Sequence, residues 1–136
     1  MEAQQNIFPE VLKELQNAKK ITHWMWFIFP QIEGLGHSST AKYYSIKNID
    51  EAKKYVADPV LGKRLLECSN ILLSIEGKSA DDILGYPDNG KLKSSMTLFN
   101  FVAPEEKIFE DVLQKYFSGE EDKRTIDLVK NEYNAR

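Results

Sequence analysis

Apolar residues recur every three or four positions along most of this chain, and this spacing constrains the fold more than any other feature. It is clear at Phe8, Val11, Leu12 and Leu15, and it continues longest between residues 61 and 75. The spacing places apolar side chains on one face of an α-helix. With no evident partner strands for a sheet, the chain is predicted to be an all-α domain of six to seven helices.

The pattern and its end signals place the elements along the chain. Thr22, Asn48 or Asp50, and Asp122 are predicted N-caps, and Ser79 with Asp82 resembles a capping box. Glu14 is assigned to the polar face of the first helix. Helices are expected at residues 8–19, 23–29, 51–57, 59–75, 91–102, 105–117 and from 122 onward, with a short one from 39 or 40 through 46 and a single turn ending at 84.

Size and charge narrow the class of protein. A chain of 136 residues fits a single domain, residues 1–136. Its net charge of −3 disfavours general nucleic-acid binding. The single cysteine, Cys68, excludes an internal disulfide. The longest apolar run, residues 24–30, is too short to span a bilayer, and the first ten residues do not resemble a signal peptide. We therefore expect a soluble, cytoplasmic protein without membrane association, metal or cofactor.

Residues 31–39 (QIEGLGHSS) form the most loop-like segment. Glycines such as Gly34 and Gly36 let backbone N–H groups approach a ligand, and Ser38 adds a hydroxyl group. The segment can therefore bind a phosphate, although it matches no established phosphate-binding motif. The alternative is that the glycines form a turn and a serine caps the following helix.

A second polar group is predicted on the helix that begins at Lys91. Helical spacing places Lys91, Ser94 and Ser95 on one face, where an ammonium group and two hydroxyl groups suit an anionic ligand. The alternative is an ordinary solvated face.

The apolar segment 23–29 contains a candidate acid–base group and two candidate stacking rings. His23 can act in proton transfer or be a hydrogen-bonded core residue. Trp24 and Trp26 are about 200° apart on a helix, so both cannot fill the same face, and one of them can line a ligand site. Whether this segment is a buried helix or a buried strand is left open by periodicity, with the helix favoured.

The strings HWMWFIFPQIEGLGHSS and KLKSSMTLF resemble a family of small bacterial domains of unknown function, some of which carry the label "calpastatin". The resemblance extends from about Phe8 to Leu128 and implies an all-α single domain with no established activity. Its pattern includes polar residues and glycines that a purely structural motif does not need. It thereby implies a ligand site built from Trp24, Trp26, Gln31, Gly34, Gly36, Ser38, Tyr43, Arg64, Asp88, Lys91, Ser94, Ser95 and Thr97.

Together these features predict a domain that binds a small phosphorylated molecule, of the nucleotide or ADP-ribose kind. Arg64 and Lys91 are expected to neutralise the phosphate, with a tryptophan stacking on a base. Two alternatives remain: an enzyme acting on a nucleotide-derived ligand with His23 as its acid–base group, and a protein-interaction module. Whether the chain forms oligomers is not predicted.

Overall fold

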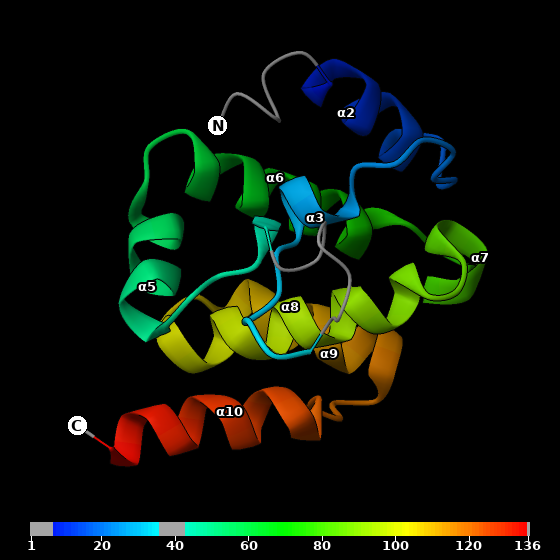
Figure 1. Ribbon diagram of the computed structural model, residues 1–136. Coiled ribbons are helices and arrows are strands. Elements are labelled where there is room, and N and C mark those ends of the chain that lie inside the picture. Colours follow the sequence, from blue (N-terminus) through cyan, green and yellow to red (C-terminus); the bar gives the residue numbers. More distant parts are fainter. Residues whose placement is uncertain (1–6, 36–42, 136) are drawn as a thin grey trace.

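A computed structural model of the chain describes residues 7–35 and 43–135, and it confirms the all-α prediction (Figure 1). Eight helices lie within these residues, one more than the upper expectation, because the single turn predicted to end at residue 84 is itself a short helix. The helices are α2 (Phe8–Gln16), α3 (Met25–Ile28), α5 (Ile49–Ala57), α6 (Leu61–Ser74), α7 (Ala80–Leu84), α8 (Asp88–Val102), α9 (Lys107–Phe117) and α10 (Lys123–Asn134).

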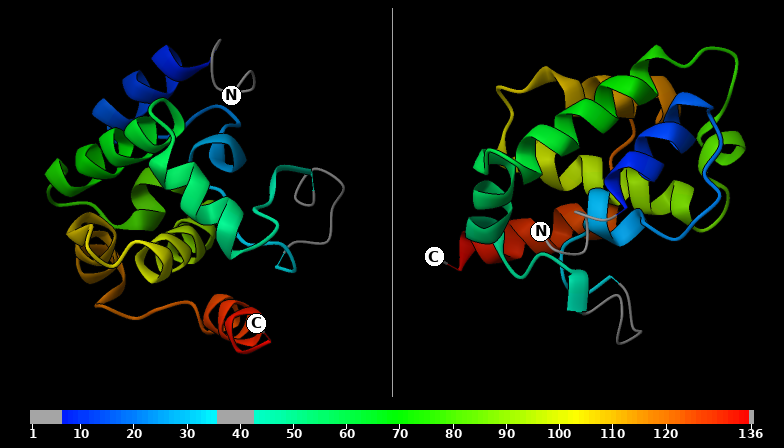
Figure 2. Two further views of the ribbon diagram at one scale, coloured as in Figure 1. Left: turned by 90° about the vertical axis from the view of Figure 1, so that its left-hand side faces the viewer. Right: turned by 90° about the horizontal axis from the view of Figure 1, so that it is seen from above.

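Helix α8 is the centre of the fold. It packs against α5, α7, α9 and α10, while α6 packs against α9 and α5 and is contacted by α2 and α3. Helices α2 and α10 therefore lie on opposite sides of α8 (Figures 1 and 2). Every one of these helices contributes buried side chains to the hydrophobic core, and α10 contributes Val129. The ring of Phe99, on α8, packs on the rings of Tyr55 and Phe109.

Three predicted N-caps, Asn48, Ser79 and Asp122, are confirmed, because each accepts a hydrogen bond from a free N–H group of the first turn of its helix. Asn48 accepts from the N–H of Glu51, and Asp122 accepts from that of Thr125. Ser79 and Asp82 form the predicted capping box. Asp58 accepts from the N–H groups of Val60 and Leu61, which starts α6.

The boundaries of three helices depart from the prediction for a physical reason that the structure shows. Helix α2 ends at Gln16, because Ala18 turns the backbone to a φ of +55°. Helix α3 has only four residues and starts without a side-chain cap, since the hydroxyl group of Thr22 is bonded to Glu14 instead. Helix α8 starts at Asp88, so Gly90 lies inside its first turn rather than in a loop.

One parallel bridge is found within residues 7–35 and 43–135, and it joins Ile32 to Ile46. The N–H of Ile46 donates to the carbonyl of Gln31, and the N–H of Glu33 donates to the carbonyl of Ile46, both at 2.8 Å. Ile46 is therefore not helical, contrary to expectation. The predicted start of that short helix, at residue 39 or 40, lies outside the described residues.

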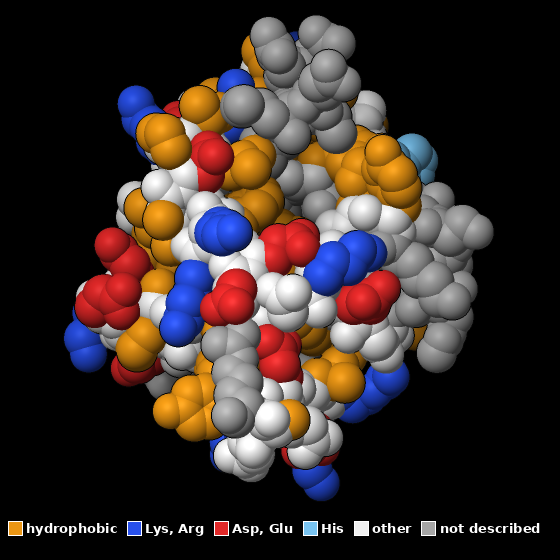
Figure 3. All heavy atoms as spheres, turned by 60° about the vertical axis from the view of Figure 1, so that its left-hand side comes forward, with side chains coloured by type: hydrophobic (Ala, Val, Ile, Leu, Met, Phe, Trp, Pro, Cys, Tyr) orange, Lys and Arg blue, Asp and Glu red, His pale blue; other side chains and the backbone are white. Residues whose placement is uncertain are grey.

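No helix in the described ranges is long and apolar enough to cross a membrane. On the face shown in Figure 3, acidic and basic side chains are interspersed rather than gathered into one charged region. This mixed distribution is consistent with the small net charge of the chain.

Thr97 links α8 to the start of α10. Its buried hydroxyl group donates to the carbonyl of Lys93 at 2.8 Å and accepts from the N–H of Asp122 at 2.9 Å. We expect Thr97→Val to lower the free energy of unfolding by about 1–2 kcal/mol, because the N–H of Asp122 loses its partner. Urea unfolding measures this effect. Thr97→Ser, which keeps the hydroxyl group, should retain more stability, and a valine variant as stable as the wild type would contradict the role.

Candidate functional site

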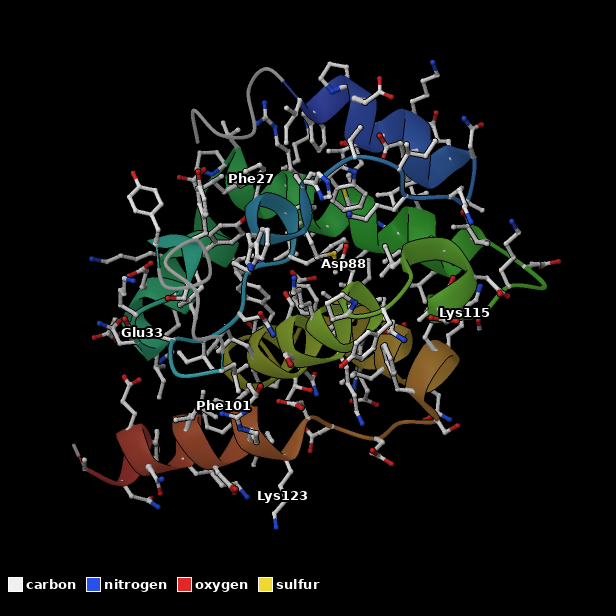
Figure 4. All side chains as sticks on the ribbon, turned by 45° about the vertical axis from the view of Figure 1, so that its right-hand side comes forward. Phe27, Glu33, Asp88, Phe101, Lys115 and Lys123 are labelled. Carbon is white, nitrogen blue, oxygen red and sulfur yellow. The ribbon has the colours of Figure 1, made fainter. Side chains whose placement is uncertain are left out.

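Asp88, at the start of α8, holds two lysine side chains. Its Oδ2 atom lies 2.7 Å from Lys20 Nζ and its Oδ1 atom lies 3.3 Å from Lys91 Nζ. The three side chains are only 7% (Lys20), 15% (Asp88) and 19% (Lys91) exposed. We call these residues the lysine–aspartate cluster; Asp88 is labelled near the centre of Figure 4. Two ammonium groups share one carboxylate, so the cluster carries a net positive charge.

Trp26 lies beside this cluster. Lys91 Nζ is 4.0 Å from the centroid of the Trp26 ring, within the range of a cation–π contact. Asp88, Lys91 and Ser95 are spaced i, i+3 and i+7, which places all three on one face of α8. The structure therefore brings four of the predicted site residues together: Trp26, Asp88, Lys91 and Ser95.

Two polar atoms in this region, Trp26 Nε1 and Ser95 Oγ, are buried and have no hydrogen-bond partner within residues 7–35 and 43–135. The Ser95 residue is fully buried. A buried polar group without a partner costs about 1–3 kcal/mol, so native proteins contain few of them.

Glu14 fixes the segment that carries Lys20. Its buried carboxylate accepts hydrogen bonds from the N–H groups of Ile21 and Thr22, at 2.7 and 3.0 Å, and from Thr22 Oγ1 at 2.6 Å. A fourth comes from Trp24 Nε1 at 2.8 Å. Burial alone would raise the pKa of Glu14, but these four bonds outweigh it and lower the pKa from 4.5 to about 2. The prediction that Glu14 lies on a polar face is therefore wrong.

The two tryptophans have different surroundings. Trp24 is fully buried in the core, with its Nε1 atom bonded to Glu14, so it has no exposed ring face on which a ligand can stack. Trp26 is half-buried and contacts Lys91. His23, the candidate acid–base group, is an exposed residue just before α3.

Other predicted site residues have structural contacts elsewhere. The guanidinium carbon of Arg64, on α6, lies 4.7 Å from the centroid of the Phe8 ring of α2. Thr97 contacts the start of α10, as described above, and Ser94 Oγ donates to the carbonyl of Gly90. Thr97 therefore lies on the side of α8 that faces the start of α10, and the Ser94 hydroxyl group already has a hydrogen-bond partner.

The predicted loop residues are only partly described. Gly34 has a φ of +110° and its carbonyl accepts from Arg124 of α10, so it packs on that helix. Gln31 takes part in the bridge to Ile46 through its backbone. Tyr43 is exposed and its ring packs on that of Tyr44. Gly36 and Ser38 lie outside the described residues.

Two residues that sequence reasoning missed, Glu14 and Lys20, organise the site. Glu14 follows Val11 by three positions and precedes Leu15, so helical spacing already placed it within the apolar stripe. That position was a usable signal for burial. Lys20 offered none, because its partner Asp88 is far away in the sequence.

Two surface hollows lie outside the cluster. A groove of about 680 Å³ follows α6 and the end of α2, lined by Gln16, Lys63, Leu66, Glu67, Asn70, Ile71 and Ser74. A smaller one of about 400 Å³ is lined by Lys53, Val56, Ala57, Val102, Ala103, Glu105 and Glu106. Neither contains a residue of the lysine–aspartate cluster.

The fold and site together define a small all-α domain with a partly buried lysine–aspartate cluster at the start of its central helix. The chain belongs to the family described as "Protein of unknown function (DUF1810)", which matches residues 1–129. It is similar to the conserved hypothetical protein Rv1873 from Mycobacterium tuberculosis, whose crystal structure is 42% identical in sequence with a TM-score of 0.93. That similarity covers 95% of this chain and 92% of the other. A comparison with curated proteins finds no match.

Proposed function

We propose that this domain binds a small phosphorylated molecule, of the nucleotide or ADP-ribose kind, at the lysine–aspartate cluster. The observation that carries the proposal is the pair of ammonium groups that share the single carboxylate of Asp88. One positive charge is left without an equal partner inside the cluster. A phosphate group compensates such a charge well, because hydrogen bonds between an ammonium group and a phosphate are stronger than hydrogen bonds between neutral groups.

Lys91 is the residue that meets the phosphate. Its side chain is the more exposed of the two lysines, and its distance to Asp88, 3.3 Å, is longer than that of Lys20. A lysine side chain is flexible, and a cation–π contact at a partly exposed site is worth only about 0.5–1 kcal/mol. Lys91 can therefore leave the Trp26 ring, which then offers its face to the base of a nucleotide.

Side chains rather than backbone amides supply the phosphate contacts in this proposal. The first N–H groups of α8 are already bonded: that of Asn89 to the carbonyl of Gly85, and those of Gly90 and Lys91 to the carbonyl of Pro87. Phosphate binding at α8 in this proposal therefore depends on lysine charge.

Calorimetric titration with AMP tests the proposal, with ADP-ribose as a second probe and adenosine as the uncharged comparison. We expect AMP to bind and adenosine to bind more weakly. Lys91→Gln should lower the affinity for AMP about 10-fold or more, because it removes the charge that meets the phosphate. The binding of AMP should also weaken as salt concentration rises.

Lys93→Gln is the matched control. Lys93 is on the same helix but is paired with Glu120, at the side of α8 that faces the loop before α10. Its removal should leave the affinity for AMP within about twofold of the wild type. The proposal is wrong if neither AMP nor ADP-ribose binds, or if the two lysine variants weaken binding equally.

A further inference from the structure

The two unpaired buried atoms, Trp26 Nε1 and Ser95 Oγ, lie next to the lysine–aspartate cluster. An indole N–H can only donate a hydrogen bond, whereas a serine hydroxyl can donate and accept. Both atoms can therefore donate to an acceptor that is not among the described residues. One phosphate already compensates the surplus positive charge of the cluster, so a second buried anion would lack a counter-charge, and we take this acceptor to be neutral.

The positions of Lys91 and Ser95 on α8 indicate how far the neutral donors lie from the charged group. Ser95 follows Lys91 by one turn on the same face of α8, which corresponds to about 6 Å along the helix axis. The ring of Trp26 lies against the ammonium group of Lys91. Lys91 therefore connects the two neutral donors, because it contacts the Trp26 ring and lies on the same face of α8 as Ser95.

We propose that Trp26 Nε1 and Ser95 Oγ bind a neutral hydrogen-bond acceptor of the ligand, about one helical turn from its phosphate. This inference rests on the proposed function and defines its ligand class more closely. The ligand is an organic phosphate that carries a carbonyl, hydroxyl or ring-nitrogen acceptor, and inorganic phosphate alone is a poor ligand. Both donors are buried in the free protein, so binding includes a rearrangement of neighbouring side chains, which we assign to Lys91 because its ammonium group lies on the Trp26 ring.

The decisive variant is Ser95→Ala, because its effects on stability and on binding should have opposite signs. Removing an unpaired buried hydroxyl group should leave the free protein at least as stable as the wild type in thermal unfolding. The same change should lower the affinity for AMP about 10-fold, because the ligand loses a hydrogen bond, and leave the weak affinity for inorganic phosphate unchanged. Trp26→Phe, which keeps an aromatic ring but removes the N–H, should lower the affinity for AMP in the same way.

Ser94→Ala is the matched control, since Ser94 Oγ is already bonded to the carbonyl of Gly90. It should leave the affinity for AMP unchanged. If the wild type binds AMP and Ser95→Ala binds it equally well, the inference is overturned while the proposed function stands. A Ser95→Ala variant that is less stable when free, with unchanged affinity, shows that a bound water satisfies the hydroxyl group and also overturns it. If the wild type binds neither AMP nor ADP-ribose, the proposed function fails and the inference fails with it.

Discussion

Replacing Glu14 with glutamine is expected to lower the free energy of unfolding by about 3 kcal/mol at pH 7. The hydrogen bonds that surround the carboxylate lower its pKa from 4.5 to about 2, and each pKa unit corresponds to about 1.4 kcal/mol. Glutamine has the same shape, with one acceptor oxygen for the three N–H groups and an NH₂ group that can donate to Thr22 Oγ1. The variant therefore mainly removes the charge.

The difference between wild type and Glu14→Gln should depend on pH in a defined direction. Because the pKa is lower in the folded protein, the contribution of Glu14 is fully present above about pH 4.5 and is lost as the pH falls toward about 2. Urea unfolding followed by circular dichroism between pH 7 and pH 2.5 measures it. The two proteins should converge in stability at the acid end.

Glu10→Gln is the control for this experiment, since Glu10 is an exposed carboxylate in the first turn of the same helix. Its effect should stay below about 1 kcal/mol, the contribution of an acidic side chain near a helix N-terminus. A difference between wild type and Glu14→Gln that is small at pH 7, or that grows on acidification, would show that the carboxylate is not the acceptor described here.

The second large effect is expected at Gly62, where α6 crosses the end of α5. A Cβ atom on Gly62 would lie 1.9 Å from the carbonyl oxygen of Val56 and 3.1 Å from that of Tyr55. Both contacts are with backbone atoms, so no side-chain rotation relieves them. Gly62→Ala should therefore lower the free energy of unfolding by about 3 kcal/mol, at the upper end of the usual range for overpacking. Thermal and urea unfolding provide the measurement.

Gly90→Ala is the matched control for this substitution. Gly90 is also helical, and a Cβ atom there would meet nothing within 4 Å. Alanine should stabilise this position by about 0.5–1 kcal/mol, because it loses less backbone freedom on folding. If both glycine variants were equally stable, the close approach of α5 and α6 would not be the reason for glycine at position 62.

The parts of the fold that depend on local chemistry were predictable from the sequence. The cap at Asn48 and the box at Ser79 are formed by side chains within three residues of their partners, so spacing alone identifies them. The long stripe of α6 follows the helical repeat for the same reason. Conversely, Thr22 looked like a cap, but a carboxylate eight residues earlier binds its hydroxyl group.

The candidate site was predicted in part, for a similar physical reason. Lys91 and Ser95 share a face of α8 by helical spacing, and the structure places them so. Arg64 was expected beside Lys91, but its cation packs on Phe8, and Lys20 approaches Asp88 instead. Contacts between elements far apart in sequence depend on how whole helices pack against one another, and the local spacing of residues does not determine that packing.

The four bonds to Glu14 also couple the first described helix to the site. Glu14 belongs to α2, which packs on α6, while its bonds hold the segment that presents Lys20 to Asp88. Local opening of α2 therefore removes one of the two anchors of this segment, the other being the hydrogen bond from the N–H of Lys20 to the carbonyl of Ile83 at 2.7 Å. If the two lysines of the cluster bind a phosphate as proposed, closure of α2 and binding are thermodynamically linked, and the bound phosphate suppresses fraying at a helix that it does not touch.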